Sequence, residues 1–353
     1  MREYLLVLFI AAGTTYLLSG LCRNIAVRTG ALATVRNRDV HTHPIPYFGG
    51  VAMFAGLAIA LLVAVQMPFL GRYTSVEHDA WTVLWAGLVI CVVGILDDLY
   101  DLDAITKLIG QILAAIIMSV LGLSWTLVYL PVGDGTTVVL DQIQATIITT
   151  IFTVALMNAI NFVDGLDGLA AGLGMIAGGA ILIFSLTVLH DQGGAVSAYP
   201  PAIMAAGLVG MCLGFLPHNF EPSRIFMGDS GSLLIGLLLA AASTSASGKI
   251  NMSLYGTADI VALMSPIIVV AAAVFIPVLD LVLAVLRRLA KGQSPFAADK
   301  LHLHHRLLSL GHTHRRTVLV LYMWVGVVTI GAVSFSVVPA RVAAGFFVVM
   351  LIA

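Results

Sequence analysis

The feature that most constrains this chain is a succession of long apolar runs separated by short polar loops. A helix needs about 17–25 apolar residues to cross the hydrocarbon core of a bilayer. Of the 353 residues, 60% are hydrophobic and only 10% are charged, whereas an ordinary soluble domain has about 25% charged residues. The sequence therefore predicts an all-α polytopic membrane protein, with one integral membrane domain over residues 1–353 and no cleavable signal peptide.

Ten runs are long enough to be membrane-spanning helices, and an eleventh is cut short by the end of the sequence. In order they are Tyr4–Val27, Phe48–Phe69, Trp81–Leu96, Leu108–Leu123, Ile143–Ile160, Leu169–Leu189, Ala198–Leu216, Ser232–Ala246, Ile260–Leu286, Thr317–Val338 and Arg341–Ala353. Pro266 and Pro277 should kink or break the ninth. We expect about 10–11 transmembrane helices, with the chain truncated within or after the eleventh.

The distribution of basic residues predicts the orientation in the membrane. Loops on one side of the bilayer hold 13 of the 17 Lys and Arg residues, and loops on the other side hold four. Cytoplasmic loops carry the excess of positive charge, so the richer side is cytoplasmic and the N-terminus lies outside. Between the fourth and fifth runs, β-rich residues flank Val132–Gly135, which predicts a small external β-hairpin.

The densest polar cluster is acidic and follows the third run directly. Asp97, Asp98, Asp101 and Asp103 place four carboxylates within seven residues. Carboxylates this close repel one another unless positive charge lies among them, and a divalent cation would supply it. The alternative is a solvated helix end that happens to be acidic.

A second polar cluster, Asn158–Gly168, follows the fifth run. Asp164 and Asp167 are three residues apart and would share a face of a helical turn, while the glycines permit a tight turn and close approach of a ligand. The alternative is an Asx-rich turn in which Asp167 caps the next helix. Two amides and two carboxylates exceed the needs of a cap, which favours a functional role.

The third motif, Phe226–Ser232, opens the eighth run. Asp229 or Ser230 can cap that helix, and the backbone N–H groups with Gly228 and Gly231 can bind phosphate. A carboxylate and an anion share one site only with a metal ion between them. Asp229 is therefore either a Mg²⁺ ligand or merely a cap.

The longest polar element, Lys291–Arg316, contains five of the ten histidines. His302, His305 and Arg306 have the spacing of one helical face. Zinc is the alternative for such a cluster, but no Cys lies nearby and no Glu separates the histidines. We interpret these residues and His304 as pyrophosphate binders or a general acid. The first loop contains Arg38 and His41, for which a purely topogenic role is the alternative.

The same orientation places all four motifs on the cytoplasmic side, after the third, fifth, seventh and ninth runs. Four loops that converge in this way predict a membrane-embedded site that faces the cytoplasm.

The motifs resemble those of a known family. Asp97-Asp98, Asn161-x-x-Asp164-Gly165-x-Asp167-Gly168, Phe226-Met227-Gly228-Asp229-Ser230-Gly231-Ser232 and His302-x-His304-His305 occur in this order. So arranged, they resemble the polyprenyl-phosphate N-acetylhexosamine-1-phosphate transferases, of glycosyltransferase family 4 type, from Arg38 to about Arg316. The histidine motif after Ser294-Pro295-Phe296 is similar to the branch that uses UDP-GlcNAc. One departure is that Ala33 and Val35 stand where relatives often have an Asp and a Pro.

The resemblance implies transfer of GlcNAc-1-phosphate from UDP-GlcNAc to a polyprenyl phosphate, undecaprenyl or decaprenyl, with release of UMP. This would be the first membrane step of a cell-envelope polysaccharide. It implies a Mg²⁺-dependent enzyme, with Mn²⁺ as a substitute, in the bacterial inner membrane with its active site facing the cytoplasm. The implied partners are both substrates, the bilayer and, because relatives are often dimeric, a second copy; nucleic acid is not expected.

The resemblance also implies roles for particular residues. Asp229 would be the leading metal ligand with Asp97 and Asp98 beside it, and these three with His302 would be catalytic. The implied substrate-binding residues are Lys107, Asn161, Asp164, Asp167, His304, His305, Arg306, Arg38 and His41. Asp98 or Asp97 is often described as a base, but a phosphate monoester has a second pKa near ~6 and is already mostly dianionic. Direct in-line attack is therefore favoured over a covalent aspartyl-phosphate route.

Two alternatives remain at this point. The donor could be another UDP-HexNAc, such as UDP-MurNAc-pentapeptide, with the same chemistry. A secondary transporter would also have kinked helices and buried acids, but its carboxylates should lie near the bilayer midplane, and here they lie at loop edges on one side.

Overall fold

The protein is a bundle of long helices with one small β-hairpin. The computed structural model describes residues 2–33, 44–130, 136–191, 196–248 and 313–338, with scattered positions between 267 and 292 and between 342 and 349. The helices of this part are α1 (Arg2–Thr29), α2 (Gly49–Gln66), α3 (Thr74–Tyr100), α4 (Ala104–Val120), α5 (Gln142–Val163), α6 (Leu169–Asp191), α7 (Tyr199–Asn219), α8 (Gly228–Gly248) and α11 (His314–Val337). The strands are β1 (Leu127–Leu130) and β2 (Thr136–Val139).

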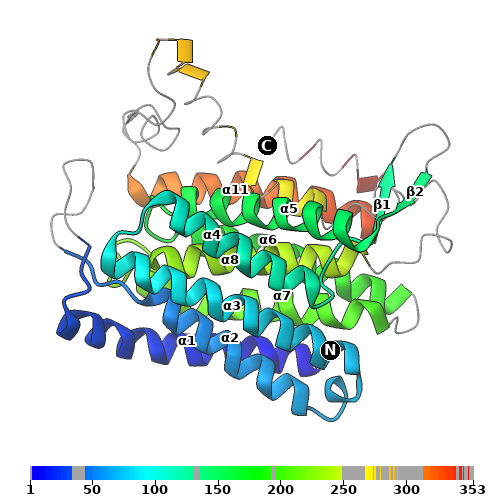
Figure 1. The fold of residues 1–353 in the computed structure, drawn as a ribbon, viewed down its shortest axis with the longest axis horizontal. Coiled ribbons are helices and arrows are strands. Elements are labelled where there is room, and N and C mark those ends of the chain that lie inside the picture. Colours follow the sequence, from blue (N-terminus) through cyan, green and yellow to red (C-terminus); the bar gives the residue numbers. More distant parts are fainter. Residues whose placement is uncertain are drawn as a thin grey trace.

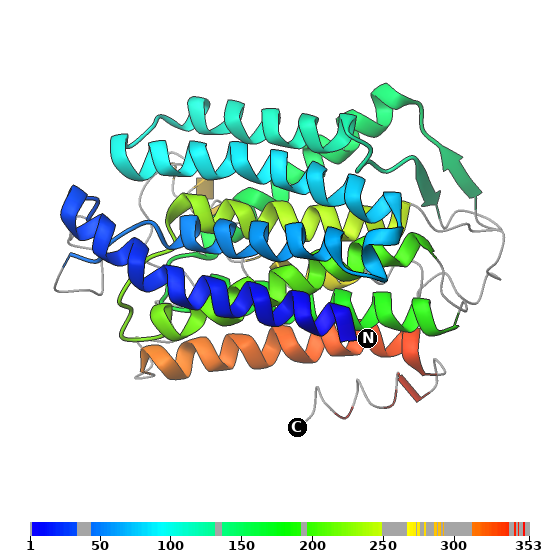
Figure 2. The ribbon, with the colours of Figure 1, turned by 90° about the horizontal axis from the view of Figure 1, so that it is seen from below.

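The helices lie side by side along one common direction, and the hairpin lies at one end of the bundle (Figures 1 and 2). Eight of the described helices are long and apolar enough to cross a membrane, and α4 is a shorter apolar helix. The prediction of an all-α polytopic membrane protein is confirmed. The antiparallel pairing of β1 with β2, which places Leu127 opposite Val139, confirms the hairpin, although its turn lies outside the described residues.

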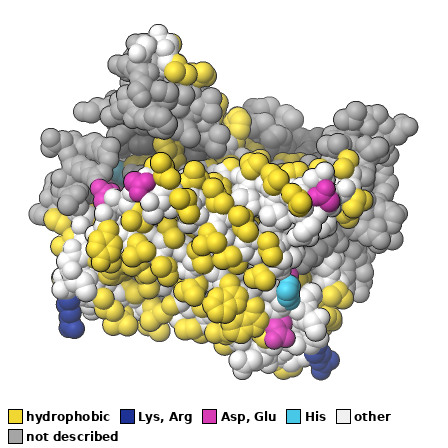
Figure 3. Space-filling view, viewed as in Figure 1, with side chains coloured by type: hydrophobic (Ala, Val, Ile, Leu, Met, Phe, Trp, Pro, Cys, Tyr) yellow, Lys and Arg dark blue, Asp and Glu magenta, His cyan; other side chains and the backbone are white. Residues whose placement is uncertain are grey.

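Helix α8 forms the centre of the bundle. Every residue of α8 from Ser230 to Ala246 is buried, and α8 packs against α3, α5, α7 and α2. The outer helices present hydrophobic side chains to the surroundings, and these cover the middle of the face seen in Figure 3. Charged side chains on that face lie toward the two ends of the bundle, as expected for a protein that spans a bilayer.

Short-range signals explain where several helices begin. The Asp103 carboxylate accepts hydrogen bonds from the backbone N–H groups of Ile105 and Thr106 and caps α4. Asp141 and Gln144 form a reciprocal capping box at the start of α5, a common way to satisfy free N–H groups. These caps determine how the loops at each end enter the bundle.

The expected helix bounds differ most from the observed ones at polar residues. We expected Asp97 and Asp98 to follow the third run, but α3 continues through Tyr100 and contains both in its last turn. Hydropathy ends a run at the first charged residue, whereas the backbone ladder continues until Asp101 adopts a left-handed conformation with φ 53°. Most of the ninth and eleventh runs lies outside the described residues.

Candidate active site

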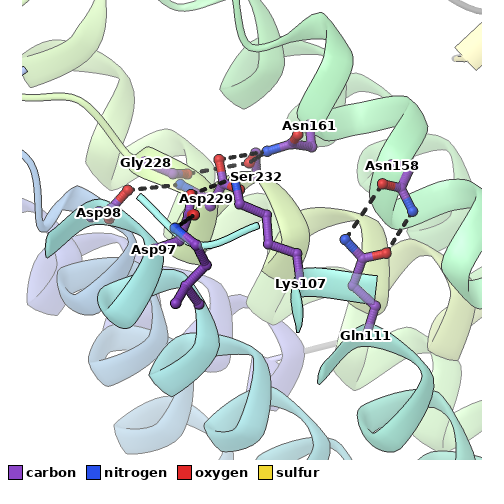
Figure 4. A network of polar contacts seen from close by, with 10 residues as sticks. Asp97, Asp98, Lys107, Gln111, Asn158, Asn161, Gly228, Asp229 and Ser232 are labelled. Carbon is purple, nitrogen blue, oxygen red and sulfur yellow. Dashed lines mark hydrogen bonds and ion pairs between the residues drawn. The ribbon is translucent and has the colours of Figure 1, made fainter. Parts of the chain in front are cut away.

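The site lies at the end of the bundle opposite the hairpin, where α3 turns into α4. The ammonium group of Lys107 on α4 lies 2.6 Å from Oδ2 of Asp97 and 3.1 Å from Oδ2 of Asp229. The second oxygen of Asp97 accepts a hydrogen bond from the backbone N–H of Leu102. One cation is therefore shared between carboxylates that are 132 positions apart in the sequence, and Figure 4 shows Lys107 pointing between them.

Helix α5 contributes an amide to the same carboxylate. Nδ2 of Asn161 donates to Oδ1 of Asp229 and to Oγ of Ser232, each at 2.9 Å. Asp229 lies in the first turn of α8, where the helix dipole favours negative charge. Its two oxygens are thus oriented by Lys107 on one side and by Asn161 on the other.

Asp98, the next residue along α3, contacts the start of α8. Its Oδ1 accepts the backbone N–H of Asp229 at 3.2 Å, while its Oδ2 is buried and has no hydrogen-bond partner among the described residues. A Cβ at Gly228 would overlap the Asp98 carboxylate, and Gly228 also has a positive φ of 65°. Only glycine satisfies both conditions, so Gly228 lets the carboxylate approach the start of α8.

The segment that leads into α8 and Asp229 is held by the start of α2. The backbone N–H groups of Gly49 and Gly50 donate to the carbonyl groups of Phe226 and Met227, each at 2.9 Å. Phe48, which precedes them, has a positive φ of 77°, a conformation that costs free energy in a residue with a side chain. This strained residue lies where the first loop contacts the motif Phe226–Ser232, and such strain is common at functional sites.

The turn between α5 and α6 carries the remaining predicted carboxylates. Asp164 is half-buried beside the site, and burial, with the charges of Asp229 and Asp167 adding, raises its pKa to about 8. Asp167 is buried, and its Oδ2 accepts the backbone N–H of Ser223 at 3.0 Å. The two carboxylates of this turn therefore have different surroundings.

One helical turn deeper, α4 and α5 are joined by a pair of amides. Gln111 and Asn158 each donate to the side-chain oxygen of the other, at 3.4 and 2.6 Å. Gln111 lies four residues after Lys107, and Asn158 lies three residues before Asn161, so each amide is on the same helix face as a site residue. Figure 4 shows this pair beside the site.

Of the predicted site residues, Asp97, Asp98, Lys107, Asn161 and Asp229 meet in one place, with Asp164 beside them. His302, His304, His305, Arg306, Arg38 and His41 lie outside the described residues. Sequence reasoning did not assign Gln111 or Ser232 to the site. For Gln111 the available signal was a polar side chain inside an apolar run, which usually has a structural or functional role. For Ser232 it was the position in the motif Phe226–Ser232.

The donor set suits a hard divalent cation. Asp97, Asp98 and Asp229 supply carboxylate oxygens, which Mg²⁺ prefers, and the unpartnered oxygen of Asp98 is an acceptor that lacks a donor. Among the described residues, however, no three His, Cys, Asp or Glu side chains are arranged so that they could hold a metal ion together.

The fold and the site define the class as multi-pass membrane proteins with an acidic, lysine-bridged site at one end of the helix bundle. Comparison with known proteins specifies the class further. The family model for glycosyl transferase family 4 matches residues 80–247. This match covers a little under half of the chain, and a relative that is 52% identical over 95% of it shows that the chain belongs to that family, in its polyprenyl-phosphate N-acetylhexosamine-1-phosphate transferase type.

Individual relatives agree with this assignment. The decaprenyl-phosphate N-acetylglucosaminephosphotransferase of Mycobacterium tuberculosis (strain H37Rv) is 52% identical, over 95% of this chain and 83% of the relative. The undecaprenyl-phosphate alpha-N-acetylglucosaminyl 1-phosphate transferases of Yersinia pestis and Escherichia coli K12 are 30% and 28% identical. Each alignment covers 83% of this chain, with 74% and 73% of the relative.

Proposed function

We propose that this protein transfers GlcNAc-1-phosphate from UDP-GlcNAc to a polyprenyl phosphate and releases UMP. The names of its relatives specify an N-acetylglucosamine phosphotransfer to a polyprenyl phosphate. Decaprenyl phosphate is our proposed acceptor, because identity is 52% to the decaprenyl enzyme and 30% to an undecaprenyl one. The product would be the first lipid-linked intermediate of a cell-envelope polysaccharide.

The observation that supports this proposal most directly is the position of Lys107 between Asp97 and Asp229. A phosphate acceptor and a pyrophosphate donor bring several negative charges together, so the site needs positive charge that can be redirected to phosphate oxygens. The two carboxylates hold the ammonium group in place. Substrate oxygens would then compete with them for the same donor.

We propose Mg²⁺ as the cofactor, with Mn²⁺ as a substitute, held by Asp229 with Asp97 and Asp98. When bound, the ion would supply Lewis-acid stabilisation of the phosphate oxygens. The chain's own contribution is to hold these carboxylates: Asn161 orients Asp229, and the backbone of Leu102 orients Asp97.

We propose direct in-line attack by the acceptor phosphate. Asp97 is held by Lys107 and Leu102, and Asp98 is held against the start of α8. Neither carboxylate is needed as a strong base, because a phosphate monoester with a second pKa near ~6 is mostly dianionic at pH 7. Both would act by positioning Lys107, Asp229 and the bound substrates.

The position of the site at one end of the bundle suits one substrate that comes from the bilayer and one that comes from water. The acceptor's isoprenoid tail must stay in the bilayer, whereas the nucleotide sugar is water-soluble, so the reaction belongs at an interface. We propose that the site faces the cytoplasm of a bacterial inner membrane, on the basis of the excess of Lys and Arg on that side.

The direct test is transfer of radiolabel from UDP-[¹⁴C]GlcNAc to decaprenyl phosphate in detergent, with and without Mg²⁺. We expect label in the lipid phase only with the ion, and a loss of about 100-fold or more in Asp229→Asn, since single electrostatic stabilisers have this effect. Asp103→Asn is the matched control, because Asn caps a helix as well as Asp, and it should keep full activity.

Other outcomes would revise the proposal in defined ways. Transfer from UDP-MurNAc-pentapeptide or another UDP-HexNAc, but not from UDP-GlcNAc, would change the donor and keep the chemistry. Full activity in EDTA would contradict the proposed cofactor. Absence of transfer from every donor would contradict the proposed function.

A further inference from the structure

Helix α11 contacts the loops behind the site at two points. Nε and Nη2 of Arg315 donate to the carbonyl oxygen of Glu221, at 3.1 and 2.7 Å. Two turns further along, the hydroxyl of Tyr322 donates to the carbonyl oxygen of Gly168. Residues seven apart lie on one face of a helix, so a single face of α11 contacts both loops.

The two loops that receive these hydrogen bonds are also bonded to each other. The backbone N–H of Ser223 donates to Oδ2 of Asp167, and the backbone N–H of Gly168 donates to Oδ1 of Asn219, each at 3.0 Å. The turn that carries Asp164 is thus tied to the segment after α7, and α11 spans both. Together the contacts form a closed ring of hydrogen bonds through α11.

The Tyr322 ring packs where two neighbouring positions must be glycine. A Cβ at Gly172 on α6 would overlap the Tyr322 ring, and Gly168 has a positive φ of 80° with the Phe220 ring 2.9 Å from where its Cβ would be. Tyr322 itself is partly buried and packs against the hydrophobic core where α11 contacts α6. The hydroxyl therefore has little freedom to leave the Gly168 carbonyl.

We infer that Arg315 and Tyr322 are positioning residues for the binding of the nucleotide-sugar donor, an inference that rests on the proposed function. The turn held by Tyr322 lies between the end of α5 at Val163 and the start of α6 at Leu169, at the end of the bundle where the acidic site lies. A water-soluble donor approaches that end from the aqueous phase, whereas the lipid acceptor approaches from the bilayer. Loosening this turn therefore changes donor binding and leaves acceptor binding unchanged.

Two variants test the inference, each with a matched control. Tyr322→Phe removes the hydroxyl and keeps the ring, and Tyr4→Phe is its control because the Tyr4 hydroxyl is buried without a partner in the described structure. Arg315→Gln removes the guanidinium, and Arg316→Gln is its control because the Arg316 side chain is exposed and, within the described part of the chain, makes no hydrogen bond to the loops. Initial rates would be measured against UDP-GlcNAc and against decaprenyl phosphate separately.

We expect the KM for UDP-GlcNAc to rise about threefold to tenfold in Tyr322→Phe and in Arg315→Gln, the effect of losing one ordinary hydrogen bond. The KM for decaprenyl phosphate should stay at the wild-type value, the melting temperature should fall by no more than about 2–4 °C, and both controls should match wild type. Equal changes in both KM values, or unchanged kinetics, would overturn the inference.

A second measurement does not depend on catalysis. Hydrogen–deuterium exchange of the unliganded protein should be faster in peptides that contain residues 164–169 for Tyr322→Phe than for wild type or Tyr4→Phe. Unchanged exchange would overturn the inference even if no donor were turned over. Absence of transfer by the wild type, in contrast, would contradict only the proposed function.

Discussion

Asp164 shows how the site changes the chemistry of a single residue. Its carboxylate lies at the end of α5, next to the charges of Asp229 and Asp167, and burial raises its pKa to about 8. An unperturbed Asp has a pKa near ~3.9. The folded protein therefore binds one proton that the unfolded chain has released, over the pH range between these two values.

This difference predicts how stability depends on pH. Because the folded state holds the extra proton, stability should fall as pH rises from about 4 to about 8 and should lose no more from this group above that range. Asp164→Asn has no such proton, so its melting temperature in EDTA should fall less steeply over the same range. Parallel curves for wild type and variant would show that Asp164 titrates normally.

At the scale of elements, the site depends on close approach of α2 and α3 to the start of α8. Ser230 is fully buried there. A Cβ at Gly94 would overlap the Ser230 backbone, and a Cβ at Gly50 would overlap the backbone of Ser230 and Gly231. Small residues at such crossings let membrane helices pack backbone to backbone, which here places Asp229 beside Asp97 and Lys107.

Gly94→Ala should therefore move the start of α8 away from α3. Because misplacement of about 1 Å at a reaction centre can cost about 100-fold in rate, we expect a loss of that order in the radiolabel assay. Gly20→Ala on α1 is the matched control, since an added methyl group there meets open space. Wild-type activity in Gly94→Ala would mean that the helices can separate without disturbing the site.

The amide pair between Gln111 and Asn158 is a second contact between elements. In membrane proteins such side-chain hydrogen bonds contribute about 0.6 kcal/mol on average and up to about 1.7 kcal/mol. We expect Gln111→Leu and Asn158→Leu each to destabilise the protein by about this amount in detergent unfolding. The double variant should lose less than the sum, and strictly additive losses would show that the two amides act independently.

At the scale of the whole molecule, the bundle has an apolar middle and two polar ends. The hairpin lies at one end and the acidic site at the other (Figure 1), and Figure 3 shows hydrophobic side chains between them. This arrangement predicts that residues near the two ends face opposite sides of the membrane. Tyr100, next to the site, and Val139, in the hairpin, are 72% and 74% exposed.

Labelling with a membrane-impermeant maleimide tests this orientation. Tyr100→Cys should react only in inverted membrane vesicles, and Val139→Cys should react only in intact spheroplasts. The three native cysteines are buried, so wild type should give little background from either side. The opposite pattern would place the site outside the cytoplasm and contradict the proposed topology.

Much of the fold could be predicted from hydropathy, because every membrane-spanning helix must be apolar over most of its length. The predicted first, second and fifth runs correspond to α1, α2 and α5. Hydropathy does not determine where these helices end, because charged residues can continue a helix at the membrane surface. Asp97 and Asp98 in the last turn of α3 are the main example.

By itself the sequence determined the class of protein and the types of residue that the site would contain. Hydropathy, the excess of positive charge on one side, and the order of the acidic motifs are local properties of the chain. Only the tertiary structure decided which of these residues meet. Lys107 lies between Asp97 and Asp229, and Tyr322 reaches Gly168 from 154 positions away, because helix packing brings together side chains whose separation along the chain carries no information about their distance in space.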